Sequence, residues 1–433
     1  MTTTLPQPVM NAVRQVAQGH RRAVAEAYAR QGMDAKRSQA WCEYGYRDSL
    51  TLNDYRQAWQ RNAIGFGAVE KVLGKVWGTS PWVIEGDAWD EATPLTAWEG
   101  MISNWAKRAG VWPMLEEADR MRMLGGYSYL LLRIADNKRM NQPVKRVNNI
   151  NAVVELVPVW ADQLRASRTE TNPDSRDFGK VLMWQYDEPV DQGVRTVDVH
   201  PDRVVQIGDP RYGIPFLRAG FNALTNIEKI EGGSGESFLK NAARQLHIDF
   251  DKDAKLRDIA DAHGVPMSDL GDVYNEVVSE MNIGNDNALI TQGATAGLLT
   301  TAAADPRPSY ETNIQSFSAS VDMASKILIG NQTGERASTE DLKSFNARCQ
   351  SDRIRHVGPK TVAPLINRLI ELKALDAPAN GFTVMWDDLT EPTKVERMDM
   401  VKVMAETNQI MFMDGGLYTR EQMLSEAGFE VEE

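Results

Sequence analysis

The stretch Ile327-Leu-Ile-Gly-Asn-Gln-Thr-Gly-Glu-Arg-Ala-Ser-Thr-Glu-Asp341 joins two helical patterns through a polar segment. Apolar residues at helical spacing precede it and predict one helix over residues 305–330. The polar residues that follow predict a loop over 331–337. Ser338 and Asp341 then resemble a capping box, which predicts that a long helix begins at Ser338.

The chain after this junction continues as a helix towards Leu375. Gly358-Pro359 and Pro364 lie inside it and predict kinks, because proline cannot donate the backbone hydrogen bond that a helix requires. Beyond it, a short apolar run predicts a strand over 382–386, and two amphipathic stretches predict helices over 393–409 and 419–427.

The first half of the chain mixes helical and strand patterns. A polar helix is expected over 9–31, and Asn53 is a plausible N-cap for the helix that follows it. Residues 98–109 and 113–124 predict two helices, and 82–84 and 127–134 predict strands. Apolar runs then alternate with turn residues over 148–207, which predicts a largely antiparallel β region with a polar loop at 165–177. The fold class is therefore α+β.

The segment between the two halves is mostly helical. Residues 216–246 read as a helix that Gly232-Gly-Ser-Gly235 must loosen or break, since glycine disfavours helices. Helices are also expected over 254–262 and 268–281. An apolar stretch rich in Thr and Ala predicts a hairpin over 287–301.

Composition indicates an acidic globular protein. The 433 residues carry a formal net charge of −12, which argues against a protein that grips nucleic acid tightly through phosphate contacts. Cys42 and Cys349 have no metal-type spacing and fit free thiols in a reducing compartment. The N-terminus lacks signal-peptide features, and no apolar run approaches the ~20 residues that span a bilayer. We therefore expect a soluble protein, intracellular where it is made, with no membrane partner.

Each candidate catalytic or metal-binding motif in the sequence lacks a residue that the motif requires. Gly232-Gly-Ser-Gly-Glu236 lacks the final glycine of a nucleophile elbow and the Lys-Ser or Lys-Thr of a phosphate-binding loop. The histidines are scattered, without the paired spacing that metal sites use. Asp249, Asp251 and Asp253 alternate as in a calcium loop, but Ala254 and Ala260 stand where an EF-hand needs Gly and Glu. We expect no catalytic, cofactor-binding or metal-binding residue, and no enzyme.

Basic residues gather between positions 336 and 360. This stretch has a net charge of +3, because three acidic residues offset six basic ones. The basic residues are Arg336, Lys343, Arg348, Arg353, Arg355 and Lys360. Two interpretations remain open: a face presented to a ligand by the preceding polar loop, or a solvent-exposed face with paired charges four residues apart.

Several segments, in their order along the chain, resemble the portal proteins of tailed bacteriophages, especially those of siphophages. The matching segments are Gly126-Tyr-Ser128 with the apolar strand after it, Gly208–Leu217, Asn287–Leu299, Ile327–Glu335 followed by Ser338, and the tail segments Gly415–Glu421 and Ala427–Phe429. In the tail, Gln422 and Leu424 stand where the family pattern has Glu and Arg. The resemblance covers nearly the whole chain from about residue 50.

The resemblance implies a portal fold with an α/β wing, a helical stem, a small α/β clip, a long kinked helix and a short helical C-terminal region. The implied segments are an N-terminal arm (1–48), the first part of the wing (49–215), a stem helix (216–246), the clip (247–304), a second stem helix (305–330), a tunnel loop (331–337), the long kinked helix with the second part of the wing (338–390), and a small crown (391–433).

The resemblance also implies a function. Portals form a ring, usually of twelve subunits, at one capsid vertex, through which double-stranded DNA is packaged and ejected. Expected partners are the terminase large subunit, a head-completion or adaptor protein, and the major capsid and scaffold proteins. The ring would lie in the virion at the portal vertex after assembly in the host bacterial cytoplasm.

Two sets of residues are candidates for contacts on this basis. Those expected to face the DNA channel are Asn331, Gln332, Thr333, Arg336 and Lys343. Those expected to contact partners at the clip are Asp249, Asp251, Leu298 and Leu299.

Two alternatives compete with this interpretation. Another oligomeric virion component, such as a head–tail adaptor or baseplate subunit, would also be acidic and non-catalytic. A nuclease would need clustered carboxylates to hold metal ions, and no such cluster is evident in the sequence.

Overall fold

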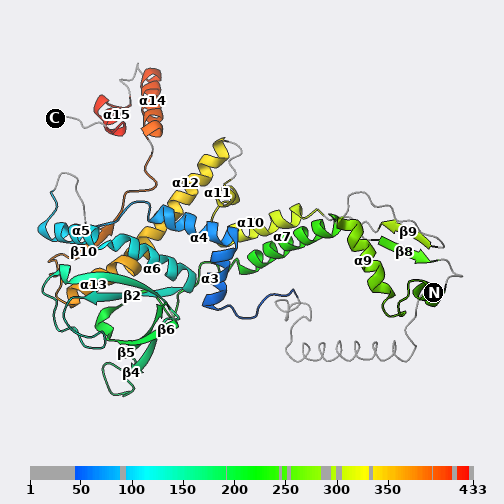
Figure 1. The fold of residues 1–433 in the computed structure, drawn as a ribbon. Helices are drawn as coiled ribbons and strands as arrows, with labels where there is room; N and C mark the ends of the chain where they lie inside the picture. Colours follow the sequence, from blue (N-terminus) through cyan, green and yellow to red (C-terminus); the bar gives the residue numbers. More distant parts are fainter. Residues whose placement is uncertain are drawn as a thin grey trace, which may run out of the picture. The chain divides into compact units, whose positions relative to one another are not determined.

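The computed structural model describes residues 44–87, 94–191, 193–242, 246–250, 255–283, 294–298, 305–330, 335–392, 394–411 and 417–428. These residues form a mixed α+β protein, as the sequence predicts (Figure 1). They divide into two units. The larger contains Tyr55–Arg218 and Val321–Glu433, and the smaller contains Ala219–Ser320 with the described residues up to Asp54. The predicted helix over 9–31 lies outside the described residues.

Both halves of the chain contribute to the larger unit. The first half contributes α3 (Leu52–Arg61, which begins in the smaller unit), α4 (Ala63–Val76), β1 (Trp82–Glu85), α5 (Ala97–Ala109), α6 (Val111–Gly125), β2 (Tyr127–Ile134), η1 (Ile150–Ala152), β3 (Val153–Trp160), β4 (Leu164–Thr169), β5 (Val181–Val190), β6 (Gly193–Val199), η2 (Pro201–Arg203) and β7 (Val204–Gly208). The second contributes α11 (Ser325–Ile329), α12 (Glu335–Asp352), η3 (Arg353–Val362), α13 (Ala363–Glu371), β10 (Phe382–Met385), α14 (Lys394–Ile410) and α15 (Arg420–Glu426).

Two helices replace the single helix predicted after residue 50. The prediction that Asn53 is an N-cap is wrong, because Asn53 lies inside α3. Thr51 precedes the helix, and its N–H donates to Asp54 Oδ2 at 2.9 Å. Asn62 interrupts the helical path with an extended backbone, and its side-chain oxygen accepts from two amides of the first turn of α4, both at 3.0 Å. Each helix therefore has its own cap.

The predicted pair of helices before a buried strand is confirmed. Helix α6 ends at Gly126, which has φ +83° and whose N–H donates to Arg122 O at 2.7 Å. Glycine reaches this left-handed conformation without steric cost, so it ends the helix and turns the chain into β2.

Strand β2 is the centre of an antiparallel sheet of order β3-β2-β7. Side chains alternate between the two faces of a strand, so Ser128, Leu130 and Leu132 share one face. Ser128 Oγ donates to Ala118 O at 2.6 Å, which identifies this face as the one that packs on α6. The opposite face carries Tyr129 and Leu131. Because both faces are covered, all residues from Ser128 to Leu132 are buried.

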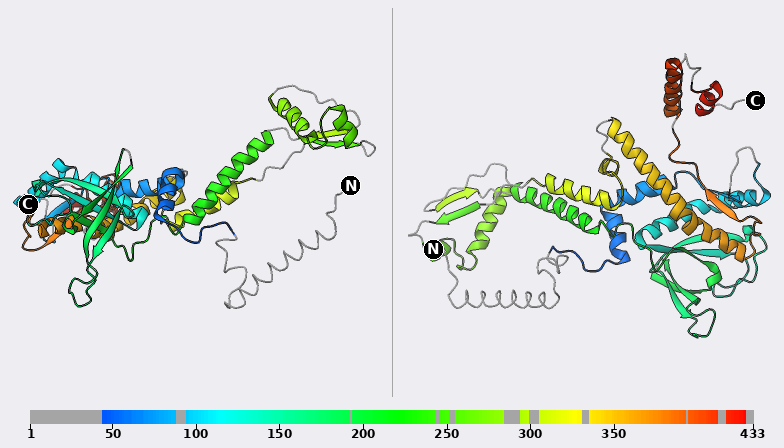
Figure 2. Two further views of the ribbon diagram at one scale, coloured as in Figure 1. Left: turned by 60° about the horizontal axis from the view of Figure 1, so that its bottom comes forward. Right: turned by 180° about the vertical axis from the view of Figure 1, so that it is seen from behind.

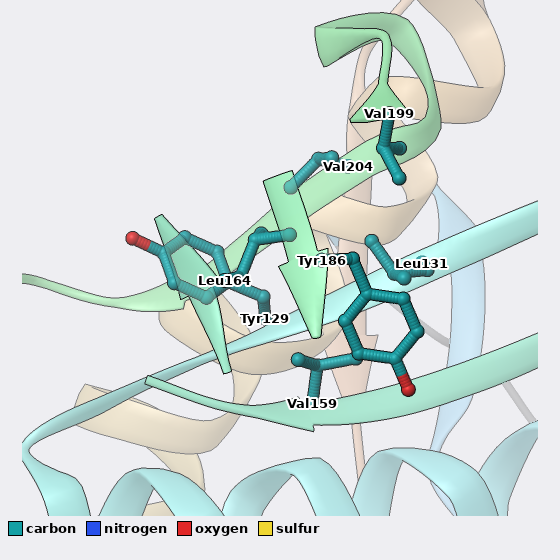
Figure 3. Packing of buried hydrophobic residues seen from close by; sticks show 7 residues of the cluster. All are labelled: Tyr129, Leu131, Val159, Leu164, Tyr186, Val199 and Val204. Carbon is teal, nitrogen blue, oxygen red and sulfur yellow. The ribbon is translucent and has the colours of Figure 1, made fainter. Parts of the chain in front are cut away.

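The second face of β2 packs against a meander of order β4-β5-β6. Figure 3 shows the shared core, formed by Tyr129, Leu131, Val159, Leu164, Tyr186, Val199 and Val204. Burial raises the pKa of Tyr129 to about 12. The predicted polar loop at 165–177 is partly wrong, because β4 (Leu164–Thr169) pairs with β5. Its outer residues are polar, so strand and loop look alike there in the sequence.

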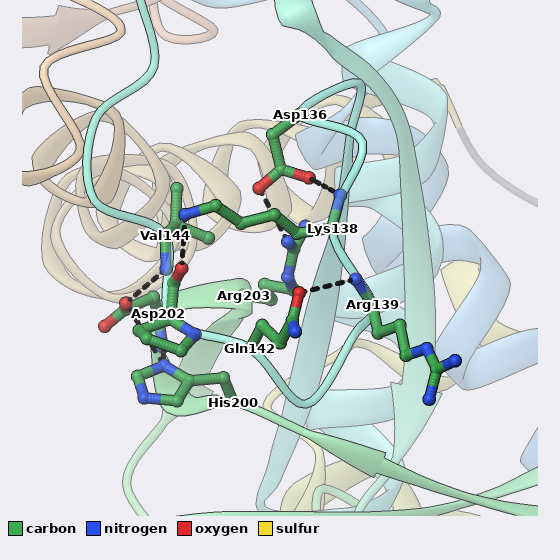
Figure 4. Close-up of polar contacts among 9 residues, drawn as sticks. Asp136, Lys138, Arg139, Gln142, Val144, His200, Asp202 and Arg203 are labelled. Carbon is green, nitrogen blue, oxygen red and sulfur yellow. Dashed lines mark hydrogen bonds and ion pairs between the residues drawn. The ribbon is translucent and has the colours of Figure 1, made fainter.

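A polar network fixes the connection between β2 and β3 (Figure 4). Buried Arg203 donates from NH2 to Asp136 Oδ2 at 2.7 Å. The Val144 N–H donates to Asp202 Oδ2 at 2.9 Å, and the Asp202 N–H donates to His200 Nδ1 at 3.2 Å. This connection is therefore anchored to η2.

The smaller unit pairs two helices that are far apart in the sequence. It contains α7 (Phe221–Ala242), β8 (Leu246–Phe250), α8 (Leu256–Ala262), α9 (Leu270–Ile283), β9 (Ala294–Leu298) and α10 (Arg307–Ser320). Helices α7 and α10 run side by side (Figure 2), and they bury Leu224, Ile227, Ile314 and Phe317. The predicted break at 232–235 is wrong, because α7 continues through it. Glycine weakens a helix by about 1 kcal/mol but keeps its N–H donor, so it does not forbid one.

Two further predictions need correction. Strand β9 pairs antiparallel with β8, with Asp249 opposite Thr295, so the strand within 287–301 finds its partner some fifty residues earlier in the chain. The single helix predicted over 305–330 is broken between α10 and α11. Asp322 has φ +50° there, a left-handed conformation that no helix continues through.

The long helix begins earlier than predicted and changes its winding. The prediction that Ser338 caps the helix is wrong, because α12 already begins at Glu335. Residues 335–337 of the predicted loop 331–337 are therefore helical, and residues 331–334 lie outside the described residues. After α12 the chain forms the π-helix η3, which contains Gly358 and Pro359. Gly358 and Pro359, where the sequence predicts a kink, thus lie within a π-helical stretch. Pro364 lies in the first turn of α13, where its missing N–H costs little.

We predict opposite effects for two Gly→Ala substitutions in the smaller unit. A Cβ on Gly220 would lie 2.5 Å from Phe317 Cδ2 in a buried contact, so Gly220→Ala should destabilise the unit by about 2 kcal/mol. Gly233 has open space around it within α7, so Gly233→Ala should stabilise the helix by about 1 kcal/mol. Hydrogen exchange of α7 and α10 peptides in the full chain measures both. Equal effects of the two substitutions would contradict this packing.

Candidate functional site

The segment around Gly330 is anchored on its N-terminal side. Helix α11 ends at Gly330, which has φ +82° and whose N–H donates to Lys326 O at 2.9 Å. Lys71 of α4 donates from Nζ to Leu328 O at 3.0 Å and also to Ile327 O. A cation at these free carbonyls satisfies them and opposes the negative end of the helix. Lys71 thus fixes where the segment leaves α11.

The predicted channel residues are only partly described. Asn331, Gln332 and Thr333 lie outside the described residues, and Arg336 lies in the first turn of α12. Lys343 is exposed, and its Nζ lies 2.9 Å from Glu396 Oε1 of α14. This hydrogen bond and the charge of Glu396 raise the pKa of Lys343. Lys343 therefore stays cationic but is paired within the chain.

The predicted basic cluster does not form one free face among the described side chains. Arg353 is fully buried. Arg348 is largely buried and lies 3.5 Å from Asp352 and 3.9 Å from Asp322. Arg355 and Lys360 are exposed. Arg348 and Asp352, four residues apart, match the interpretation of paired charges.

Arg353 is instead the anchor of the long helix. Its guanidinium donates from Nε to Val76 O at 2.8 Å and from NH1 to Asp387 O at 2.9 Å. NH2 donates to Lys75 O at 3.3 Å and to Thr79 Oγ1 at 3.2 Å. Burial lowers the pKa of Arg353, which nonetheless remains charged because its usual value is so high. One side chain thus joins the end of α4 to the segment after β10.

The buried carboxylate of Asp119 also holds the π-helical stretch, from α6. Asp119 of α6 accepts from Trp77 Nε1 at 3.0 Å, from Arg122 Nε at 2.6 Å and from Thr361 Oγ1 at 3.2 Å. The three donors come from the end of α4, from α6 itself and from η3. Two buried charges, Arg353 and Asp119, therefore fix the π-helical stretch by separate bonds. The sequence singled out neither for this role, because the partners lie far away in the chain.

The described residues offer little for catalysis. Burial raises the pKa of the Cys349 thiol to about 11, so this sulfur is a poor nucleophile at neutral pH. Nowhere in the described ranges do three or more His, Cys, Asp or Glu side chains gather as metal ligands would. Among the helices described, none has the length and apolarity needed to cross a bilayer.

Comparison with known proteins identifies the family. The family model described as phage portal protein matches residues 99–410, most of the chain, including the long helix and its anchors. This chain belongs to the phage portal protein family. The match favours a portal over a head–tail adaptor or a baseplate subunit, and the portal family is structural rather than enzymatic.

Among the solved structures similar to this portal protein are chains of gene transfer agent (GTA) particles. One, described as the neck of a native particle computed with C12 symmetry, has 15% identity and a TM-score of 0.48, over 92% of this chain and 99% of the other. Another, described as the virion of a native particle, has 17% identity and a TM-score of 0.46, over 89% and 95%. No functionally curated protein matches the sequence significantly.

Two of the four predicted clip residues of this portal lie among the described residues. Asp249 is exposed on β8, and Leu298 is the last residue of β9. Asp251 and Leu299 lie outside the described residues. The two described positions belong to one two-stranded sheet, although they are 49 residues apart.

We predict that Arg353→Met destabilises the portal chain while Arg355→Met does not. The first change removes a buried cation and leaves three carbonyls without their donor, which should cost roughly 3 kcal/mol. The second removes an exposed cation of the same size and should cost under about 0.5 kcal/mol. Urea unfolding followed by tryptophan fluorescence measures both, since Trp77 and Trp386 flank the anchor. Similar losses in the two variants would contradict the role of Arg353.

We also predict that Cys349 is protected from thiol reagents in the folded chain. With a folded pKa of about 11 against about 8.5 in the unfolded chain, the thiolate fraction at pH 8 is roughly 200-fold smaller when folded. The raised pKa stabilises the fold below pH ~8.5, and this contribution is lost as the pH rises towards 11. A Cys42→Ser variant treated with a chromogenic disulfide at pH 8 should react only after urea is added. Prompt labelling of folded protein would contradict this.

Proposed function

We propose that this portal protein assembles into a closed ring of the twelve subunits that the family resemblance implies, at one capsid vertex. Double-stranded DNA passes through its opening. The family match over residues 99–410 carries this proposal. A ring requires head-to-tail interfaces that close on themselves, and the exposed apolar side chains of the described residues can supply such contacts.

The charge distribution fits DNA that slides rather than binds. A chain of net charge −12 repels phosphates overall, which favours passage without sticking. We propose that 331–337 faces the channel, with Arg336 and Lys343 at or near its wall. The ion pair between Lys343 and Glu396 weakens the attraction of that lysine for phosphates, as sliding contact requires. The DNA contact would be independent of sequence.

We assign the parts of the ring in the order that the family resemblance implies. The smaller unit supplies the stem through α7 and α10 and the clip through β8, α8, α9 and β9. The larger unit supplies the wing and, from residue 391, a small crown. The clip, with Asp249 and Leu298 among its described residues, would contact the terminase large subunit during packaging and a head-completion or adaptor protein later. Major capsid and scaffold proteins would surround the ring.

The protein itself would carry out no chemistry. The packaging ATPase would be a separate partner, and the structural character of the portal family supports this division. The ring would assemble in the host bacterial cytoplasm and remain in the virion at the portal vertex.

Electron microscopy of the purified full chain tests the proposal. We expect rings with a central opening wide enough for duplex DNA, and a mass by light scattering that is a fixed multiple of 48.4 kDa. Nuclease and ATPase assays with Mg²⁺ should show no turnover.

Two outcomes would contradict the proposal. A chain that stays monomeric, even within virus particles, would exclude the ring. Hydrolysis of ATP or DNA that a point substitution abolishes would exclude a purely structural role.

A further inference from the structure

The loop from Asp209 to Phe216, here named the knob loop, exposes two large apolar side chains. Tyr212 is 79% exposed and Ile214 is 72% exposed. Exposed apolar side chains this close together are typical of binding surfaces, and tyrosine is enriched among the residues that dominate interfaces.

The backbone beneath these side chains is held rigidly. Gly213 N–H donates to Asp209 O and Phe216 N–H donates to Met123 O, both at 2.7 Å. Asp209 Oδ1 accepts from Arg211 N at 2.8 Å. Gly213 also lies so close to Gly126 that a Cβ at either position would clash with the other backbone. A preorganised loop loses little conformational entropy on binding, so its exposed side chains are suited to a partner.

A second feature of the larger unit is a groove with apolar surface. A groove of about 870 Å³, here named the α12 groove, lies between α12 and the chain from Leu389 to Met400. Leu342 (50% exposed) and Met400 (36% exposed) contribute apolar surface to it. Its volume falls in the range of about 300–1,000 Å³ that protein pockets use for specific ligands.

The two surfaces lie on opposite sides of α12. Ile214 of the knob loop borders a hollow lined by Arg348 and Asp352, whereas Lys343 and Asn346 line the groove. At 3.6 residues per turn, Asn346 and Arg348 are about 200° apart, and Lys343 and Asp352 about 180° apart. A subunit in a head-to-tail ring needs two different surfaces on different sides, because each copy contacts two neighbours.

The charges of the two surfaces are also complementary. Arg211 of the knob loop and Lys360 line one hollow together with a single acidic residue, Asp209, which gives this side an excess of positive charge. Glu391, Glu396 and Asp399 line the groove against one cation, Lys343. Glu391 and Glu396 are paired with Arg397 and Lys343. Within the described part of the chain, neither Arg211 nor Asp399 has an ion-pair partner, so each has its charge available for a second molecule.

We propose that the knob loop of one copy inserts Tyr212 and Ile214 into the α12 groove of the next copy, with Arg211 facing Asp399. The occupant is a second copy of this chain, because each copy presents both surfaces and neither surface can reach the other within one molecule across the width of α12. The inference rests on the proposed ring and assigns residues to its subunit interface. Lys343 and Glu396 would then lie at the seam between two subunits, near the channel wall proposed above.

Assembly of full-length variants tests this interface. Tyr212→Ala and Ile214→Ala should each raise the concentration of half-maximal ring assembly by about tenfold or more, as loss of a central interface side chain does. The matched control Tyr212→Phe keeps the ring and should assemble like the original chain. Arg211→Glu and Asp399→Arg should each weaken assembly, and the double variant should restore it. Light scattering over a dilution series, with negative-stain images, provides the readout.

Covalent capture, carried out at concentrations at which the variants form rings, tests the contact itself. In a Cys42→Ser background, Tyr212→Cys combined with Leu342→Cys should give, on oxidation, a ladder of disulfide-linked oligomers extending beyond the dimer. Each single cysteine variant should give no ladder. Rings that form normally in all variants and give no ladder would overturn the interface but leave the proposed function intact. Absence of rings from the original chain would instead overturn the proposed function.

Discussion

The guanidinium of Arg353 is the interaction on which the arrangement of the larger unit depends. A buried cation is costly unless its donors are satisfied, and here carbonyls and one hydroxyl accept from Nε, NH1 and NH2. Those acceptors lie at the end of α4 and after β10, hundreds of residues apart. The long helix therefore cannot slide along α4 without leaving several polar groups unpaired in the core.

This constraint explains the π-helical winding that follows. Arg353, Val357, Gly358, Thr361 and Val362 are all buried, a spacing wider than an α-helix would place on one face. Thr361 of this stretch donates to Asp119, and Pro359 has no N–H to donate to a helical bond of either kind. The α-helical hydrogen bonds are absent from this stretch, and the bonds of Arg353 and the bond between Thr361 and Asp119 hold it in place. Helix α12 thus ends in an anchored stretch, and Lys71 holds the end of α11, which precedes α12 in the chain.

The predictability of each element follows from how local its cause is. Helix α6, its stop at Gly126 and strand β2 were predictable because a proline, a glycine and an apolar run lie within the elements themselves. The break at Asp322 and the true start of α12 were not, since nothing in the local pattern separates Ser338 from the cap it resembles. The site shows the same limit. Arg353 looked like a member of a basic surface cluster, and only its distant acceptors reveal an internal anchor.

Several charges of the described residues in this portal protein are used within the chain. Arg353 and Asp119 are buried in the larger unit, Arg348 is paired with its own helix, and Lys343 is paired with α14. A protein that gripped DNA would instead leave such cations free and clustered, because its affinity comes from neutralised phosphates. The proposed conduit requires the opposite: a stiff wall with little net attraction for its cargo. Placing the cations in structural bonds gives both properties at once, since each bond that stiffens the wall also removes a charge that could hold the DNA.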